Sequence, residues 1–211
     1  MISAATALAR LRAGNRRFVA DLRTQATAKG AARHDQLIAE QAPMAIVLGC
    51  SDSRVPAEIV FDQGLGDLFV IRVAGNIVAP SQIGSVEFAA SRYGTRLVVV
   101  LGHSQCGAIL ATLEAIQRPG EPHSRNLRSI VDRIRPALEP VLASELGQRP
   151  EALVHHAVRA NIRASANQLR HGSAVLEQLR QSEGLVVVGA EYALDTGEVD
   201  FFDGLPLGAS G

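Results

Sequence analysis

Four short apolar runs, separated by longer segments of helical character, most constrain the fold of this chain. The runs cover residues 44–48, 67–73, 97–101 and 185–188 and are rich in Val, Ile and Leu. Runs of this length and composition are typical of strands that are buried on both faces of a parallel sheet. Because helix-like segments alternate with them, the pattern favours repeated strand–helix–strand units.

The segments between and around these runs are predicted to be helical. The expected helices cover residues 4–22, 34–41, 56–62, 81–93, 106–117, 124–143 and 151–181, the last with a break near Gly172. Residues 23–34 are small and polar, which indicates a loop or an extended arm. The tripeptide 195–197, Asp-Thr-Gly, predicts a turn into a final strand over 198–202.

The fold class is therefore predicted to be α/β. We expect a mostly parallel sheet of four parallel strands plus one antiparallel edge strand, flanked by helices. The 211 residues suffice for one domain, with an N-terminal helical arm over 1–40 and an α/β core over 41–211. The chain has no Trp, so this core must be built mainly from Val, Ile, Leu and Ala.

Charge and hydropathy exclude several classes of partner. The formal net charge is zero, which gives no electrostatic reason to expect nucleic acid or an anionic membrane as a partner. No apolar run approaches the length of a membrane span, and the N-terminal sequence has no apolar core of a signal peptide. We therefore expect a soluble, cytoplasmic protein.

Two of the predicted strands end in small residues that are followed by polar ones. One strand runs into "GCSD", which contains Cys50 and Asp52, and another runs into "GHSQC", which contains His103 and Cys106. In open α/β sheets, sites form outside the carboxyl ends of the strands. If the two strands are neighbours, these four side chains converge on one crevice.

Two thiolates and an imidazole are a donor set that suits zinc. Cys50, His103 and Cys106 would leave a fourth position open, as in catalytic zinc sites, and Asp52 could fill that position or stand beside it. Each cysteine lies at an equivalent strand end with a polar partner, and the chain has only these two. This coincidence favours a metal site.

Other interpretations of the cysteines stay open at this point. A buried Cys is often only a small hydrophobic residue. Alternatively, Cys50 could be a nucleophile whose pKa is lowered by Arg54. A phosphatase-type loop is disfavoured, because the spacing from Cys50 to Arg54 is short and Asp52 between them would repel an anion.

The paired motifs C-x-D-x-R at 50–54 and H-x-x-C at 103–106 together resemble those of the β-class carbonic anhydrases. The resemblance runs from about residue 41 to residue 108 and continues more loosely through "AEYALDTGEVDFF" near the end. It implies a lyase that hydrates carbon dioxide reversibly to bicarbonate and a proton. It also implies a homodimer or homotetramer whose N-terminal helix wraps a partner subunit, with the active site near the dimer interface.

The resemblance also implies roles for individual residues. Those that match the family's zinc ligands, for one Zn²⁺ per chain, are Cys50, His103 and Cys106. Asp52 and Arg54 match its catalytic pair. Residues that match positions near the substrate are Gln41, Phe69, Phe88 and Gly107, of which the two phenylalanines would line a small apolar pocket for carbon dioxide.

Zinc lowers the pKa of its bound water from about 16 to about 7, so that zinc-bound hydroxide attacks carbon dioxide near neutral pH. Two thiolate ligands and one imidazole should give the bound water a higher pKa than three histidines would. We therefore expect activity to rise into the mildly alkaline range. Asp52 paired with Arg54 would orient the zinc water, whereas Asp52 released from Arg54 would take the fourth metal position and gate the site.

In some family members the closed state is linked to bicarbonate bound beside a Trp three residues before the first Cys. That position is Val47 here, which favours the open state. Arg72, charged within a strand-like run, is expected to have a partner at the site or at an interface. A hydrolase for carbonyl sulfide or carbon disulfide would share the same ligands, and a non-catalytic member would be expected to lack Asp52, Arg54 or a ligand.

Overall fold

The computed structural model of the chain describes residues 2–22, 41–118 and 124–205. Its sheet has five strands in the order β2-β1-β3-β4-β5, all parallel except β5, which pairs antiparallel with β4. The strands are β1 (Ala45–Gly49), β2 (Leu68–Arg72), β3 (Leu97–His103), β4 (Val186–Tyr192) and β5 (Val199–Asp203). The predicted α/β class and the antiparallel edge strand are confirmed.

Helices account for most of the remaining described residues. They are α1 (Ala4–Val19), α3 (Ala57–Val60), α4 (Pro80–Arg92), α5 (Gly107–Gln117), α6 (Arg125–Leu142), α7 (Pro150–His171) and α8 (Ala174–Ser182), with 3₁₀ turns η1 (Ala74–Asn76) and η2 (Glu145–Gln148). The predicted break near Gly172 is confirmed, and Ser173 caps α8 by accepting a hydrogen bond from the Leu176 N–H. The helix expected over 34–41 lies outside the described residues except for Gln41, which is not helical.

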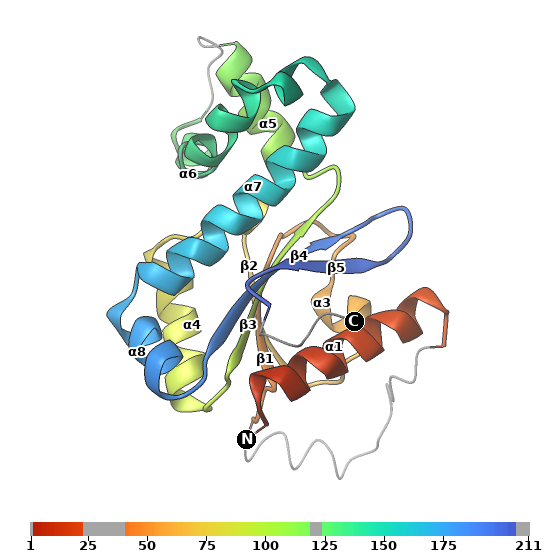
Figure 1. The fold of residues 1–211 in the computed structure, drawn as a ribbon, viewed down its shortest axis with the longest axis vertical. Helices are drawn as coiled ribbons and strands as arrows, with labels where there is room; N and C mark the ends of the chain where they lie inside the picture. Colours follow the sequence, from red (N-terminus) through yellow and green to blue (C-terminus); the bar gives the residue numbers. More distant parts are fainter. Residues whose placement is uncertain (1, 23–40, 119–123, 206–211) are drawn as a thin grey trace.

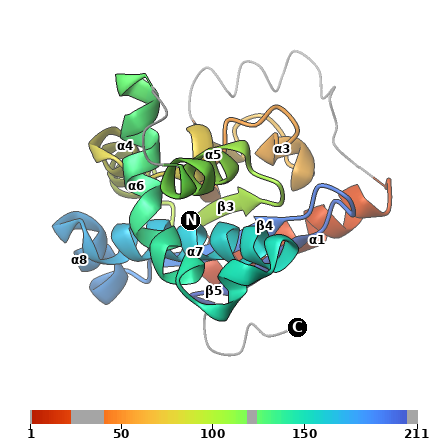
Figure 2. The ribbon, with the colours of Figure 1, turned by 90° about the horizontal axis from the view of Figure 1, so that it is seen from above.

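The sheet is buried on both faces, as the apolar runs predicted. Alternate residues of each strand point to opposite faces. Ile46 and Leu48 of β1 join a core with α4, α5, α6, α7 and α8, whereas Ala45 and Val47 join a second core with α1 and α3. Figure 1 shows α1 and α3 on one side of the sheet and α4, α7 and α8 on the other. Seen from above, α1 and α8 lie at opposite sides of the molecule (Figure 2).

The fourth strand extends further than the predicted 185–188. It continues to Tyr192 and pairs with β3 as far as His103. The extension includes the buried carboxylate of Glu191, a residue type that a local apolar pattern does not place in a central strand. Arg159 of α7 makes the extension possible, because its Nε donates to Glu191 Oε2 over 2.8 Å and compensates the buried charge.

Helix α1 packs against the sheet of its own chain. Leu8 and Leu11 are fully buried in the core that contains Val47. Asn15 Nδ2 donates hydrogen bonds to two main-chain carbonyls. One belongs to Val60, the last residue of α3, at 3.2 Å, and the other to Gly197 in the β4–β5 turn, at 2.8 Å. The described part of the predicted arm is thus an integral part of the fold. No helix within the described ranges is long and apolar enough to cross a membrane.

Candidate metal centre

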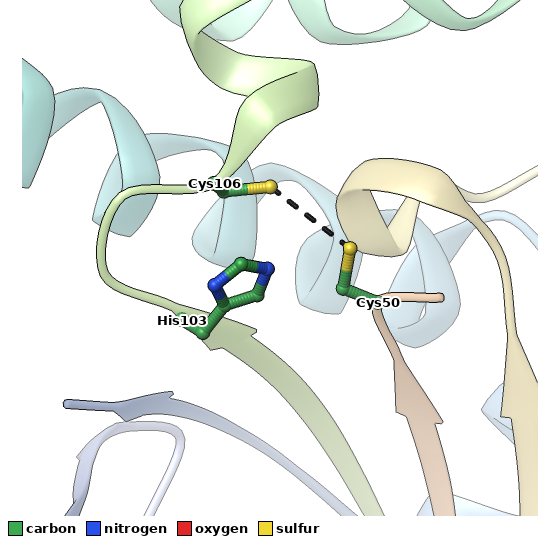
Figure 3. Close-up of side chains that lie close together, drawn as sticks. All are labelled: Cys50, His103 and Cys106. Atoms are coloured by element: carbon green, nitrogen blue, oxygen red, sulfur yellow. Dashed lines mark hydrogen bonds between the residues drawn. The ribbon is translucent and has the colours of Figure 1, made fainter. Parts of the chain in front are cut away.

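Three side chains from different elements converge at the carboxyl end of the sheet (Figure 3). Strands β1 and β3 are parallel neighbours, so Cys50, which follows β1, lies beside His103, the last residue of β3. Cys106 is the N-cap of α5. The ligand atoms of these three residues all lie within 4.8 Å of one another, and all three residues are buried. The predicted convergence of the two strand ends is confirmed.

The arrangement fits a tetrahedral metal ion. Two sulfur ligands at about 2.3 Å from zinc, at a tetrahedral angle, are separated by about 3.8 Å. The Cys50 and Cys106 sulfurs are 4.0 Å apart. The Nε2 atom of His103 is buried and has no hydrogen-bond partner among the described residues. A buried, unpartnered nitrogen beside two sulfurs is a donor set that suits a tetrahedral zinc ion, so the residues fit zinc.

The carbonyl of Ser104 determines which nitrogen of His103 is available to a metal. His103 Nδ1 lies 2.9 Å from the Ser104 oxygen and donates its proton there. Nε2 is then the unprotonated nitrogen, which is the form that binds a metal. Ser104 is itself fixed, because its N–H donates to the Tyr192 carbonyl and its hydroxyl accepts from the Leu194 N–H.

The pKa values of the two thiols are shifted in opposite directions. A hydrogen bond with Cys106 and the proximity of the His103 imidazole lower the pKa of Cys50 to about 4 despite its burial. The hydrogen bond with Cys50, together with burial, raises the pKa of Cys106. Burial lowers the pKa of His103, but its interaction with Cys50 outweighs this and raises the pKa overall. A divalent cation bound at this position would deprotonate both thiols.

Asp52 and Arg54 lie beside the cluster and are paired with each other. Arg54 Nε donates to Asp52 Oδ1 over 2.9 Å, Nη2 donates to Oδ2 over 2.7 Å, and the Arg54 main-chain N–H donates to Oδ1 over 3.0 Å. The side-chain hydrogen bonds hold the pKa of Asp52 well below its usual range. Asp52 Oδ2 is 3.8 Å from His103 Nε2. The carboxylate is thus ionised and near the cluster, but held by Arg54.

Arg72, the last residue of β2, holds the main chain of the same loop. Its Nε donates to the Cys50 carbonyl over 3.0 Å, and its Nη2 donates to the Asp52 carbonyl over 2.6 Å. The charged residue within a strand-like run therefore has its partners at the site, as expected. Arg54 therefore holds the Asp52 side chain, and Arg72 holds the main chain of the loop that carries it.

Three of the residues predicted to lie near the substrate form a separate group. Gln41 Nε2 donates to the Tyr93 hydroxyl over 2.7 Å. The ring centroid of Phe69 lies 6.3 Å from that of Phe88 and 6.2 Å from that of Tyr93. Phe69 pairs with the β1 residue four places before Cys50, which is about 13 Å along the strand. The structure therefore does not bring these residues to the cluster of the same chain.

Gly107, by contrast, follows the last cysteine directly and is the first residue of α5. A side chain built there would meet nothing within 4 Å, so its Cα borders open space. Sequence reasoning missed Asn161 and Ser165, two buried polar residues of α7 whose side chains contact the turn beside Cys50. Their spacing of four on a helix face that is otherwise apolar was the available signal.

Fold and cluster together define an α/β protein with a Cys₂His group of the kind that holds a catalytic transition metal. A family model described as carbonic anhydrase matches residues 45–199. The chain belongs to this family, whose members are lyases, and its fold is that of the β class. The resemblance inferred from the two motifs is confirmed.

Relatives and solved structures agree with this assignment. A carbonic anhydrase of Mycolicibacterium smegmatis is 38% identical over 190 residues, covering 90% of this chain and 89% of the relative. Carbonic anhydrase 2 of Mycobacterium tuberculosis is 37% identical over 188 residues, covering 89% and 87%. The β-carbonic anhydrase CafA of Aspergillus fumigatus superposes with a TM-score of 0.75 at 25% identity, covering 97% of this chain and 93% of that one. A Coccomyxa β-carbonic anhydrase in complex with acetazolamide superposes with a TM-score of 0.73 at 25% identity, covering 92% of this chain and 86% of that one.

Proposed function

We propose that this enzyme hydrates carbon dioxide reversibly to bicarbonate and a proton, with one Zn²⁺ per chain held by Cys50, His103 and Cys106. The observation that carries the proposal is the buried, unpartnered Nε2 of His103 facing two sulfurs 4.0 Å apart. Support comes from the relatives that are named carbonic anhydrases and cover most of the chain.

Zinc, when bound, would supply a nucleophile near neutral pH by lowering the pKa of a water molecule to about 7. Asp52 contributes a fixed hydrogen-bond acceptor that orients the attacking water towards carbon dioxide. Because its pKa is held below the usual range by Arg54, Asp52 is a weak base and does not store the released proton. The proton leaves to water or buffer, and Asp52 acts by orientation.

We propose that the site rests in the open state, with Asp52 paired to Arg54 and the fourth metal position available. The three hydrogen bonds from Arg54 to the Asp52 carboxylate support this. Release of Asp52 from Arg54 would let the carboxylate, already 3.8 Å from His103 Nε2, move to the metal and close the site.

Gln41, Phe69, Phe88 and Gly107 are proposed to contact the substrate. Because Phe69 lies about 13 Å along the strand from Cys50 of the same chain, a role for the aromatic group requires a second subunit. We propose a homodimer or homotetramer in which β2 lies at the interface between subunits. The half-exposed apolar residues of this edge strand and the 52% exposed Phe88 support that placement. Light scattering of the purified protein tests it, and a monomer would exclude it.

The function is tested by stopped-flow carbon dioxide hydration at pH values from about 6.5 to 9, with zinc measured on the same sample. We expect about one zinc per chain and a rate that rises with pH. Zinc without hydration at any pH would exclude carbonic anhydrase activity and direct the search to carbonyl sulfide and carbon disulfide. Absence of zinc would overturn the ligand assignment and leave Cys50 as a reactive thiol.

A further inference from the structure

The turn η1 (Ala74–Asn76) presents a main-chain N–H to one of the candidate metal ligands. The N–H of Gly75 lies 3.4 Å from the Cys50 sulfur. Gly75 has a φ of 69° and Asn76 a φ of 43°, so both adopt the left-handed conformation. This conformation, rather than a regular helix or strand, directs the Gly75 N–H towards the sulfur.

Two side chains of α7 hold the turn from the other side. Asn161 Nδ2 donates to the Gly75 carbonyl over 2.8 Å, and Ser165 Oγ donates to the Asn76 carbonyl over 3.0 Å. Asn161 is 2% exposed and Ser165 is 5% exposed, so water does not substitute for either donor. The two residues are four apart, so they lie on one face of the helix and reach the consecutive carbonyls of Gly75 and Asn76.

Two neighbouring helices closely fill the space around Gly75. A Cβ atom on Gly75 would lie 2.8 Å from Ile134 Cδ1 of α6 and 3.0 Å from Ala108 Cβ of α5. Helices α5 and α6 therefore pack against Gly75, while α7 supplies its hydrogen bonds. Three helices that follow the candidate metal ligands in the sequence thus contact this turn.

We propose that Asn161 and Ser165 are positioning residues for the metal centre, acting through the Gly75–Asn76 turn to hold an N–H donor against the Cys50 thiolate. The inference rests on the proposed function in so far as Cys50 is a zinc ligand. A hydrogen bond to a metal thiolate withdraws electron density from the sulfur and fixes the orientation of the ligand. Loss of such an outer contact typically costs 10- to 100-fold in metal affinity or activity.

A purely structural role would predict a different result. Buried hydrogen bonds to main-chain carbonyls stabilise a protein wherever they lie. If Asn161 and Ser165 did only this, their removal would lower the free energy of unfolding without changing the bonding between Cys50 and the metal. Spectroscopy of the sulfur–metal bond therefore separates the two roles.

The experiment uses the full chain with Co²⁺ in place of Zn²⁺, in the variants Asn161→Ala and Ser165→Ala. We expect the sulfur-to-cobalt charge-transfer band to shift to lower energy, because a thiolate that loses its donor gives up electrons more easily. Zinc affinity, measured by competition with a chromophoric chelator, should fall at least about tenfold in Asn161→Ala. Ser165→Ala is the smaller change and should shift the cobalt band and the zinc affinity in the same directions. If Asn161→Ala does not fold, the Ser165→Ala results alone test the inference.

Thr95→Val is the matched control. Thr95 Oγ1 donates to the Pro43 carbonyl over 2.8 Å and is buried, but it precedes β3 and so lies at the opposite end of the sheet. This variant should lose similar unfolding free energy and keep the wild-type cobalt spectrum and zinc affinity. A wild-type spectrum and affinity in both α7 variants would overturn the inference and leave the proposed function standing. A wild-type protein that binds no zinc would instead refute the proposed function.

Discussion

At the scale of single residues, Arg54 controls where the Asp52 carboxylate lies. In Arg54→Ala, the two side-chain hydrogen bonds to Asp52 are lost, and the carboxylate becomes the nearest free anion to the metal position. We expect zinc to be retained and the hydration rate at neutral pH to fall by about 10- to 100-fold, as for other outer contacts of metal sites. Stopped-flow hydration and zinc analysis of the same sample measure both quantities.

Arg118→Ala provides a control for the loss of an exposed arginine. Arg118 pairs with Glu114 over 3.3 Å on the exposed side of α5. Exposed pairs of this kind contribute little, so this variant should keep the wild-type rate. A wild-type rate in Arg54→Ala would show that Asp52 does not need Arg54 to stay off the metal.

The lowered pKa of Asp52 determines the expected pH dependence. A carboxyl group whose pKa is lower in the folded protein than its ordinary value of 3.8 stabilises the fold above that value, and this stabilisation is lost as pH falls through the lower, folded pKa. Asp52 therefore stays ionised throughout the neutral and mildly acidic range. We expect kcat/KM to rise with pH through one midpoint, at or above about 7, that belongs to the attacking water.

The measurement is kcat/KM for carbon dioxide hydration in buffers from about pH 4 to 9. A second acidic step between about pH 4 and 6 would contradict the assignment, because it would mean that a carboxyl group with an ordinary pKa controls the rate.

The sequence could predict the residues whose own side-chain chemistry makes the cluster. Cys50, His103 and Cys106 were identified because only a few residue types bind zinc and because these follow two strand ends. Ser104 and Asn161 were missed, since they act through main-chain carbonyls. Any backbone can supply a carbonyl, so even where spacing marks a polar pair such as Asn161 and Ser165, the sequence does not show which carbonyl each side chain contacts, and only the fold shows it.

At the scale of helices and strands, a strand could be predicted from the sequence wherever its buried residues are apolar. The start of β4 was found, but its end was not, because Glu191 is buried beside Arg159 and His155. These partners come from α7, which precedes β4 in the sequence, and they compensate a carboxylate whose burial without a partner would be unfavourable. Long-range pairing of this kind is the information that a local hydropathy pattern lacks.

The contact between α7 and β3 depends on the absence of a side chain at Gly102. A Cβ there would lie 2.5 Å from Ile162 Cδ1 and 2.6 Å from Ile162 Cγ1. We expect Gly102→Ala to lower the free energy of unfolding by about 1–3 kcal/mol through overpacking. Ile162→Ala alone should cost about 2–5 kcal/mol through the cavity it leaves.

The double variant Gly102→Ala, Ile162→Ala tests the contact directly. Because the new methyl group fills space vacated by the isoleucine, the double variant should be less destabilised than the sum of the single variants. Urea unfolding of the zinc-saturated proteins measures all four corners of the cycle. Strict additivity would show that α7 moves away from β3 to accommodate the methyl group, in which case the close approach is not required.

At the scale of the whole molecule, the candidate ligands join parts of the fold that are distant in sequence. Cys50 follows β1, whereas His103 and Cys106 link β3 to α5, and the turn beside Cys50 is held by α7. A metal ion at this point would connect the centre of the sheet with the helices on one of its faces. Metal binding should therefore stabilise the folded protein as a whole.

Zinc removal tests this connection. An ion that binds only the folded state, at a free concentration 100-fold above its dissociation constant, adds about 2.7 kcal/mol to the free energy of unfolding. For a chain of this size, that corresponds to a midpoint of thermal unfolding about 5–10 °C higher than in the chelator-treated protein. Differential scanning calorimetry before chelation, after chelation and after zinc is restored measures the shift.

Cys106→Ser, which lacks one ligand, should show a much smaller shift, because its zinc affinity is lower. An equal shift in that variant would mean that zinc stabilises the chain from somewhere other than the Cys50, His103 and Cys106 cluster.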